Sequence, residues 1–258
     1  MEVLVPFATD EPKSRLRAVF SPAERLAFAS AMLADVLDAV AAAGPDPTVL
    51  AVEEPAAVDA PATTVPDGDL PTDPGGVVAD RGVDVRVDER PLTTAINAAL
   101  AGHFGGGGIN GGSGGTDDGD PEGDGDAGEP DPVAVVVADL ALATPASLRA
   151  LFAADGEVVV APGLGGGTSA LVVRHPAFRV DYHGASCRDH RERAAAVGAD
   201  LATVDSRQLA TDVDEPADLA EVLLHGDGAA AAWLRAAGVS LAVDERGRVG
   251  VERDGERF

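Results

Sequence analysis

The segment Pro132-Val-Ala-Val-Val-Val-Ala138 is a continuous apolar run that ends at an acidic residue, Asp139. Such a run, rich in β-branched residues and without polar alternation, is typical of a parallel strand that is buried on both faces. Further strands are predicted at four shorter apolar runs, which are Glu2–Val5, Thr48–Val52, Glu157–Ala161 and Ala170–Val173.

Helices are predicted between these strands from their start signals. Ser21-Pro-Ala-Glu-Arg25 places Ser at the N-cap, Pro at the first helical position and Glu at the third, and this helix continues to about Ala43. Thr144–Phe152 begins with the same Thr-Pro signal, and Leu92–Ala101 has helical spacing of apolar residues. Because strands alternate with helices, the sequence predicts an α/β fold with a mostly parallel central sheet flanked by helices.

Three regions fall outside this alternation. Residues 77–87 contain short apolar pieces of about strand length. Residues from about 103 to 131 are almost entirely Gly, Asp, Glu, Asn and Pro, which cannot bury a core, so a disordered surface insertion is expected there. Residues 226–258 contain two short apolar runs that predict a small hairpin. We therefore predict one domain over residues 1–225, interrupted by the insertion, and a C-terminal extension.

The amino-acid composition indicates adaptation to a salty solvent rather than a particular binding partner. The chain has 258 residues, a net charge of −25 and a pI of about 4.3, which resembles the acid-rich proteins of salt-loving archaea. Nucleic acids and anionic membranes need a basic face, so neither is an expected partner. The single cysteine, Cys187, excludes an internal disulfide. With no apolar run near the roughly 20 residues needed to cross a bilayer and no signal peptide, a cytoplasmic protein is expected.

Lys13 is the only lysine of the chain, and it follows the first predicted strand, two residues before Arg15. Ligands of such sheets bind beyond the carboxyl ends of the strands, where a fixed cation suits phosphate oxygens. Arg15 could add a bidentate contact to the phosphate oxygens. The alternative is that both side chains are ordinary solvated surface charges.

Carboxylates follow two distant segments. Asp139 ends a buried strand, where an acid needs a hydrogen bond, an opposite charge or a metal ion, although it could simply cap the next turn. Asp212 and Asp214 lie two residues apart before Pro216, which is predicted to begin a helix. Their alternative role is helix capping, by Asp214 or by Glu215. Acids from separate strand ends near a cation fit a Mg²⁺ ion on a nucleoside triphosphate.

The glycine-rich segment Gly163-Leu-Gly-Gly-Gly-Thr168 lets the backbone approach a ligand, and its successive N–H groups could form a nest for an anion. It fits neither the P-loop nor the dinucleotide fingerprint, and such segments are often only turns. Downstream, Ser186 is a possible anion donor near a helix start. His183 and His190 have no third soft ligand nearby, so a zinc site is not expected.

Taken in order, eight segments resemble the 2-phospho-L-lactate guanylyltransferase family, the nucleotidyltransferases of coenzyme F-420 biosynthesis. The resemblance extends from residue 1 to about 225, apart from the insertion. The segments are Val5-Pro-Phe7, Pro12-Lys-Ser-Arg-Leu16, Ala31-Met-Leu-Ala-Asp35, Pro91-Leu-Thr-Thr-Ala95, Ala138-Asp-Leu140, Gly165-Gly-Gly-Thr168, Tyr182–His190 and Asp212–Leu219.

The resemblance implies a GT-A-like, Rossmann-like nucleotidyltransferase fold that joins GTP to 2-phospho-L-lactate or phosphoenolpyruvate and releases pyrophosphate. It also implies roles for residues: Pro6, Phe7, Lys13 and Thr93 at the nucleotide; Lys13 and Arg15 in catalysis; Asp139, Asp212 and Asp214 at Mg²⁺; and Thr168, the backbone of His183 and Ser186 at the phosphorylated acid. A homodimer is possible. The alternatives are a sugar-phosphate or molybdopterin nucleotidyltransferase of the same fold and a non-catalytic GTP-binding module.

The sequence departs from the family pattern at three positions. Thr93 stands where the family usually has Asn, and the chain carries Asn97 instead. Ala141 replaces a usual Pro, which affects the rigidity of a turn, and His183 replaces a frequent Gly beside the acid. These changes concern the nucleotide contact from Thr93 and the choice of acid.

Overall fold

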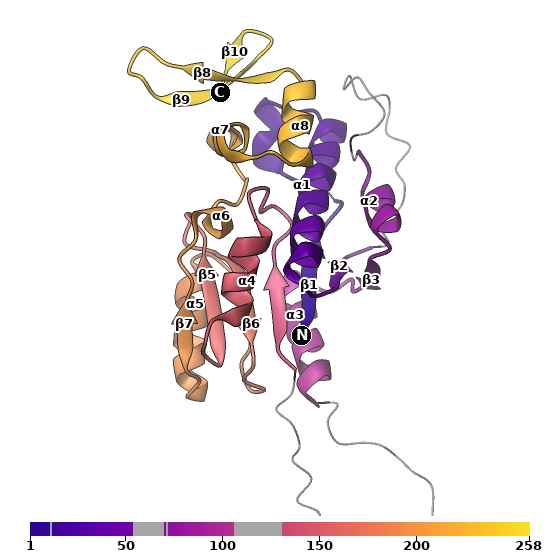
Figure 1. Cartoon of the computed structure of the whole chain (residues 1–258), viewed down its shortest axis with the longest axis vertical. Helices are drawn as coiled ribbons and strands as arrows, with labels where there is room; N and C mark the ends of the chain where they lie inside the picture. Colours follow the sequence, from indigo (N-terminus) through magenta and orange to yellow (C-terminus); the bar gives the residue numbers. More distant parts are fainter. Residues whose placement is uncertain (11, 54–69, 71, 106–130) are drawn as a thin grey trace, which may run out of the picture.

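The computed structural model describes residues 1–10, 12–53, 70, 72–105 and 131–258. Within these residues a seven-stranded sheet has the order β3-β2-β1-β4-β6-β5-β7 (Figure 1). Its strands are β1 (Glu2–Phe7), β2 (Pro47–Ala51), β3 (Asp84–Val87), β4 (Val133–Val136), β5 (Val158–Pro162), β6 (Thr168–Val173) and β7 (Leu201–Thr203). Adjacent strands are parallel except at β6, which is antiparallel to both β4 and β5. The predicted α/β fold with a mostly parallel sheet is confirmed.

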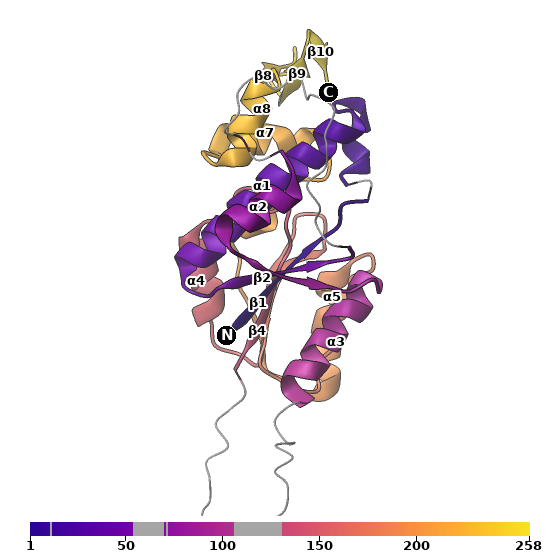
Figure 2. The same cartoon turned by 90° about the vertical axis from the view of Figure 1, so that its right-hand side faces the viewer.

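Helices cover both faces of this sheet, as Figure 2 shows. One face carries α1 (Pro22–Ala43), α2 (Pro74–Arg81) and α4 (Pro145–Ala153), and the other carries α3 (Leu92–Gly105) and α5 (Ser186–Val197). Within β4, Ala134 and Val136 belong to the core on the first face, and Val133 and Val135 to the core on the second. Burial on both faces explains why this strand lacks polar residues.

Helix α1 is the long apolar element of the core. It has 22 residues, and an 18-residue window with a mean hydropathy of 1.7 is 67% buried. The expectation that no segment is long and apolar enough to cross a membrane was therefore wrong on length and composition. Its contacts with α2, α4 and α8 (Ala229–Ala236) make α1 the core helix of the domain instead.

Only part of residues 77–87 is extended, although strand pieces were predicted along the whole segment. Asp73 caps α2 by accepting a hydrogen bond from the Gly76 N–H at 2.7 Å, and Pro74 occupies the first turn. These start signals outweigh the strand preference of Val77 and Val78, so only β3 is extended.

The predicted start of the insertion, at about residue 103, falls within a helix. Residues 103–105 form the end of α3, and 106–130 lie outside the described residues. His103 joins the two flanks, because its Nδ1 lies 3.0 Å from Glu2 Oε2 and its Nε2 lies 2.6 Å from the Asp131 carbonyl oxygen.

The C-terminal region is more than the predicted hairpin. After α7 (Pro216–His225) and α8, the strands β8 (Val239–Val243), β9 (Val249–Arg253) and β10 (Glu256–Arg257) form an antiparallel sheet. The Trp233 side chain of α8 is fully buried against Phe20 and Phe28, so this region shares the core of α1. The division of the chain at about residue 225 stays a prediction.

Arg253 ties β9 to the start of α1. Its Nη1 donates to the Val19 carbonyl at 2.9 Å, its Nη2 lies 2.5 Å from Glu24 Oε1, and its guanidinium lies 5.5 Å from the Phe20 ring centroid. Burial opposes ionisation of Glu24, but the Arg253 hydrogen bond holds the pKa of that carboxyl below its ordinary value. The contacts of Arg253 with Val19 and Glu24 thus hold the segment that follows the Lys13 loop in place.

Arg253→Met is expected to lower the free energy of unfolding by about 2 to 3 kcal/mol, because the partly buried Glu24 carboxylate loses its cation. Thermal unfolding in molar KCl measures it, with the exposed Arg246→Met as the matched control. Since the pKa of Glu24 is lowered in the folded protein, the difference from wild type should shrink as the pH falls below the ordinary value of 4.5. Equal stability of both variants would contradict this anchoring role.

Candidate active site

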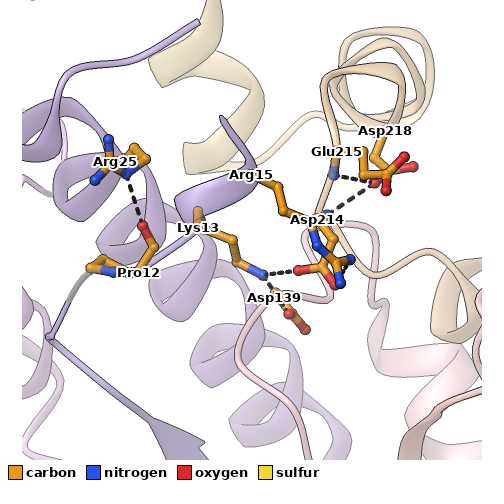
Figure 3. A network of polar contacts seen from close by, with 8 residues as sticks. All are labelled: Pro12, Lys13, Arg15, Arg25, Asp139, Asp214, Glu215 and Asp218. Atoms are coloured by element: carbon orange, nitrogen blue, oxygen red, sulfur yellow. Dashed lines mark hydrogen bonds and ion pairs between the residues drawn. The ribbon is translucent and has the colours of Figure 1, made fainter. Parts of the chain in front are cut away.

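Lys13 lies at the end of a loop whose backbone is fixed by α1. The residue has a left-handed conformation, with φ of 54°, directly before the short 3₁₀ helix η1 (Ser14–Ala18). The buried Arg25 side chain donates to the Pro12 carbonyl at 3.1 Å (Figure 3). It also donates to the Phe20 carbonyl at 3.2 Å. A non-glycine residue with positive φ is uncommon, and such backbones are often found at functional sites.

The Lys13 ammonium joins two of the predicted acids. Its Nζ lies 2.5 Å from Asp139 Oδ2 and 3.0 Å from Asp214 Oδ1 (Figure 3). Burial lowers the pKa of Lys13, but the two carboxylates outweigh it and raise the pKa above its ordinary value. With a side chain only 11% exposed, Lys13 is not a solvated surface charge. Arg15 is 67% exposed, and its Nη1 lies 3.6 Å from the Asp214 carboxylate.

Asp139 and Asp212 are close enough to affect each other. Burial raises the pKa of Asp212, and the charge of Asp139 raises it further. The Val213 N–H donates to the Asp139 carbonyl at 3.3 Å, which joins the two segments. Asp139 Oδ1 is buried and has no hydrogen-bond partner among the described residues. The two carboxylates therefore form an acidic pair with an unsatisfied oxygen.

Capping of α7 is not the role of the Asp214 side chain. Glu215 is the N-cap residue, and the Asp218 carboxylate accepts from the N–H groups of Asp214 and Glu215 at 2.9 and 2.7 Å (Figure 3). The backbone of Asp214 is thus held by the helix, and its carboxylate is directed at Lys13.

A largely apolar cavity of about 300 Å³ lies beside Lys13 and Asp139. Three of the predicted nucleotide-binding residues, Pro6, Phe7 and Lys13, line it, together with these other residues: Ala8, Pro12, Ala29, Met32, Leu50, Ala51, Val52, Asp88, Arg90, Leu92, Ala95, Val137, Ala138 and Asp139. Asp88 and Arg90 were not among the predicted site residues. Their position directly after β3 was the available signal, but the limits of β3 were not predicted correctly.

Thr93 does not line that cavity. Its Oγ1 accepts a hydrogen bond from the Tyr182 N–H at 3.1 Å. One turn later on α3, Asn97 exchanges two hydrogen bonds with the backbone of Val180, at 3.1 and 2.8 Å. Helix α3 therefore uses both side chains to hold the segment that leads into α5.

The predicted acid-binding residues Thr168 and Ser186 are brought together at the start of β6. The Thr168 N–H donates to Ser186 Oγ at 2.9 Å, and both residues are buried. Because β6 is antiparallel, its first residue lies at the edge where β4 and β5 end. His183 differs, since its side chain is 82% exposed and pairs with Asp181 at 2.5 Å. Only its backbone remains available for the predicted role.

Three N–H groups of the glycine loop are not available for the expected anion nest. Those of Gly163, Leu164 and Gly166 donate to backbone carbonyls of Gly167, Ala210 and Gly163. The loop instead permits a close approach, because a Cβ on Gly163 would lie 2.7 Å from Ser169 Oγ and 3.4 Å from Asp212 Oδ1.

No three His, Cys, Asp or Glu side chains gather as a ready-made metal site over residues 1–10, 12–53, 70, 72–105 and 131–258. Asp139, Asp212 and Asp214 therefore do not count as such a site. The two histidines of the Tyr182–His190 segment are placed differently, since the His183 side chain faces solvent and His190 is fully buried.

Comparison with solved structures supports the fold. A candidate nucleotide-diphospho-sugar transferase from Desulfovibrio desulfuricans G20 superposes with a TM-score of 0.60 at 16% identity, covering 91% of this chain and 95% of the other. A nucleotidyl transferase from Methanothermobacter gives a TM-score of 0.50 at 14% identity, covering 91% of this chain and 97% of the other. The predicted nucleotidyltransferase fold is confirmed.

Comparison of sequences is more specific. A 2-phospho-L-lactate guanylyltransferase from Halomicrobium mukohataei is 51% identical over 98% of this chain and its own full length. One from Haloterrigena turkmenica is 54% identical over 98% of this chain and 97% of its own length. The family model described as "Guanylyl transferase CofC like" matches residues 1–59 and 126–254, well beyond the expected limit near residue 225. The chain therefore belongs to the family of CofC-like guanylyltransferases.

Proposed function

We propose that the protein is a cytoplasmic 2-phospho-L-lactate guanylyltransferase of coenzyme F-420 biosynthesis. Its substrates would be GTP and 2-phospho-L-lactate, as the names of its relatives indicate. The observation that carries the proposal is Lys13, held between Asp139 and Asp214 beside an apolar cavity. A cavity for a base and sugar next to a buried cation for phosphates suits a nucleoside triphosphate.

The reaction needs no protein nucleophile. A phosphate oxygen of the acid attacks the α-phosphorus of GTP, the bond from that phosphorus to the bridging oxygen of the β-phosphate breaks, and pyrophosphate leaves. Lys13 and Arg15 neutralise the charge that develops on the leaving group. Asp214 positions both cations, since it lies within 3.0 Å of Lys13 and 3.6 Å of Arg15.

The acidic pair fits a Mg²⁺ ion. Asp139 Oδ1 is a buried oxygen without a partner, and Asp212 lies in the repulsive field of Asp139. Hard oxygen ligands of this kind, one or two per ion, are what Mg²⁺ takes when phosphates supply the others. Bound there, Mg²⁺ would supply positive charge to the triphosphate. Asp214, the third predicted ligand, would have to exchange its contacts with Lys13 and Arg15 to join them.

Guanine would lie at the far end of the cavity, near Asp88 and Arg90. Asp88 directly follows β3, and its N–H donates to the Ala51 carbonyl. In the sheet order, β3 lies three strands from β4, the strand that precedes Asp139, which corresponds to about 14 Å at the usual strand spacing. Its carboxylate holds Arg90, with Arg90 Nε at 2.7 Å. A guanidinium fork suits the O6 and N7 acceptors of guanine, and a carboxylate suits its N–H donors.

Pyrophosphate release tests this proposal directly. We expect turnover of GTP with 2-phospho-L-lactate above that with phosphoenolpyruvate, 3-phosphoglycerate or a sugar phosphate, and above that of ATP, CTP or UTP. Arg90→Ala should reduce the preference for GTP over ATP by about 10-fold, the value of roughly one lost bidentate contact. Equal turnover of a sugar phosphate would favour a different nucleotidyltransferase, and no turnover with any pair would contradict the proposed activity.

A further inference from the structure

His190 of α5 is a fully buried histidine with both ring nitrogens occupied. Its Nδ1 lies 2.8 Å from Thr168 Oγ1, and its Nε2 lies 2.9 Å from the backbone nitrogen of Asp181. The ring centroids of Phe178 and Tyr182 lie 6.0 and 5.2 Å from that of His190. The imidazole is therefore fixed in place by two polar contacts and two aromatic side chains.

These contacts determine the tautomer. The Asp181 N–H can only donate, so Nε2 of His190 must be the acceptor. Burial lowers the pKa of His190 to about 4, which leaves the ring neutral near pH 7. A neutral ring that accepts at Nε2 carries its proton on Nδ1, and that proton is donated to the Thr168 hydroxyl oxygen.

The hydrogen of the Thr168 hydroxyl must then point elsewhere. Its oxygen accepts from His190, and the Thr168 N–H donates to the Ser186 hydroxyl oxygen. Neither hydroxyl donates to a protein acceptor in the part of the chain that the structure describes. Both residues are buried, at 5% and 3% exposure, where an unpaired donor costs free energy. Two neighbouring hydroxyls thus have hydrogens without an acceptor among the described residues, which a ligand that only accepts would satisfy.

We propose that His190 is a positioning residue that fixes the Thr168 hydroxyl as a donor to the anionic end of the phosphorylated acid. The inference rests on the proposed function and adds a residue and a direction of hydrogen bonding to it. Carboxylate and phosphate oxygens are acceptors without donors, which such a site requires. Because the N–H groups of Gly163, Leu164 and Gly166 already donate to backbone carbonyls, the two hydroxyls supply donors that these three groups cannot.

The tautomer can be measured without turnover. In ¹⁵N NMR of the whole protein in molar KCl, His190 is expected to carry its proton on Nδ1 both with and without 2-phospho-L-lactate. His190→Gln identifies the signal, because the variant lacks it. A proton on Nε2, or a doubly protonated ring at pH 7, would overturn the proposal. This result stands apart from the proposed activity, which fails separately if the wild-type enzyme releases no pyrophosphate.

Kinetics then test how His190 acts. His190→Phe is expected to raise the KM for 2-phospho-L-lactate about 10-fold or more, as expected for hydrogen bonds to a charged group, with the KM for GTP nearly unchanged. His190→Gln, which keeps a donor and an acceptor, should recover part of this loss. The exposed Arg191→Gln on the same helix is the matched control.

A double-mutant cycle separates positioning from general packing. Thr168→Val keeps the side-chain shape and removes the hydroxyl, so His190→Phe should add little to the effect of Thr168→Val on the KM for the acid. Additive effects, or equal changes in the KM values of both substrates, would show that His190 only supports the fold.

Discussion

Lys13→Ala is expected to lower kcat/KM by about 100-fold or more, equivalent to roughly 3 kcal/mol at 1.4 kcal/mol per tenfold. The variant removes a mostly buried ammonium, with the side chain 11% exposed, that lies 2.5 Å from Asp139 and 3.0 Å from Asp214. Triphosphate would then meet two carboxylates without the cation between them. Pyrophosphate release at saturating Mg²⁺ in molar KCl measures the effect, and Arg17→Ala, an exposed cation of the 3₁₀ helix that follows Lys13, is the control.

Lys13→Arg should recover only part of this loss. A guanidinium is a planar fork and cannot occupy the position of a compact ammonium between two carboxylates. Arginine is otherwise abundant in this chain, so a Lys13 that was merely a solvated surface charge would tolerate the exchange. Full activity of either variant would contradict the role of Lys13, and thermal unfolding checks that Lys13→Ala still folds.

Asp212→Asn has the second large expected effect, a loss of about 100- to 1000-fold in kcat, because an amide cannot supply the charge that holds Mg²⁺ against a triphosphate. The melting temperature should be unchanged or higher, since a neutral amide removes the repulsion between Asp212 and Asp139. Asp205→Asn removes an exposed charge from the same region and serves as the control. Near-normal turnover of Asp212→Asn would exclude the metal assignment.

The elements that carry their own signals could be predicted from sequence. The run before Asp139 lacks polar alternation because β4 is buried on both faces, and the start of α1 has a capping box in which Ser21 and Glu24 bond each other's backbone. Strand ends also predicted Lys13 and Asp139 as neighbours, because parallel strands bring their carboxyl ends to one edge.

Other features depend on contacts between distant segments. Asp88 and Arg90 line the cavity only because β3 pairs with β2, and in the sequence Asp88 is one of 44 acids. In the sequence, nothing assigns a role to His190; only the fold brings its Nδ1 to within 2.8 Å of Thr168 Oγ1. The glycine loop predicted free N–H groups, but three of them, those of Gly163, Leu164 and Gly166, donate to backbone carbonyls.

The reaction product tests the central claim most directly. In ³¹P NMR of wild-type enzyme with GTP, Mg²⁺ and 2-phospho-L-lactate, we predict two coupled diphosphate resonances of a guanosyl product and an equal amount of pyrophosphate, both lost in Asp212→Asn. Bond formation at the α-phosphorus requires this pair of products. Release of orthophosphate with GDP, or consumption of GTP that does not depend on the acid, would contradict the account.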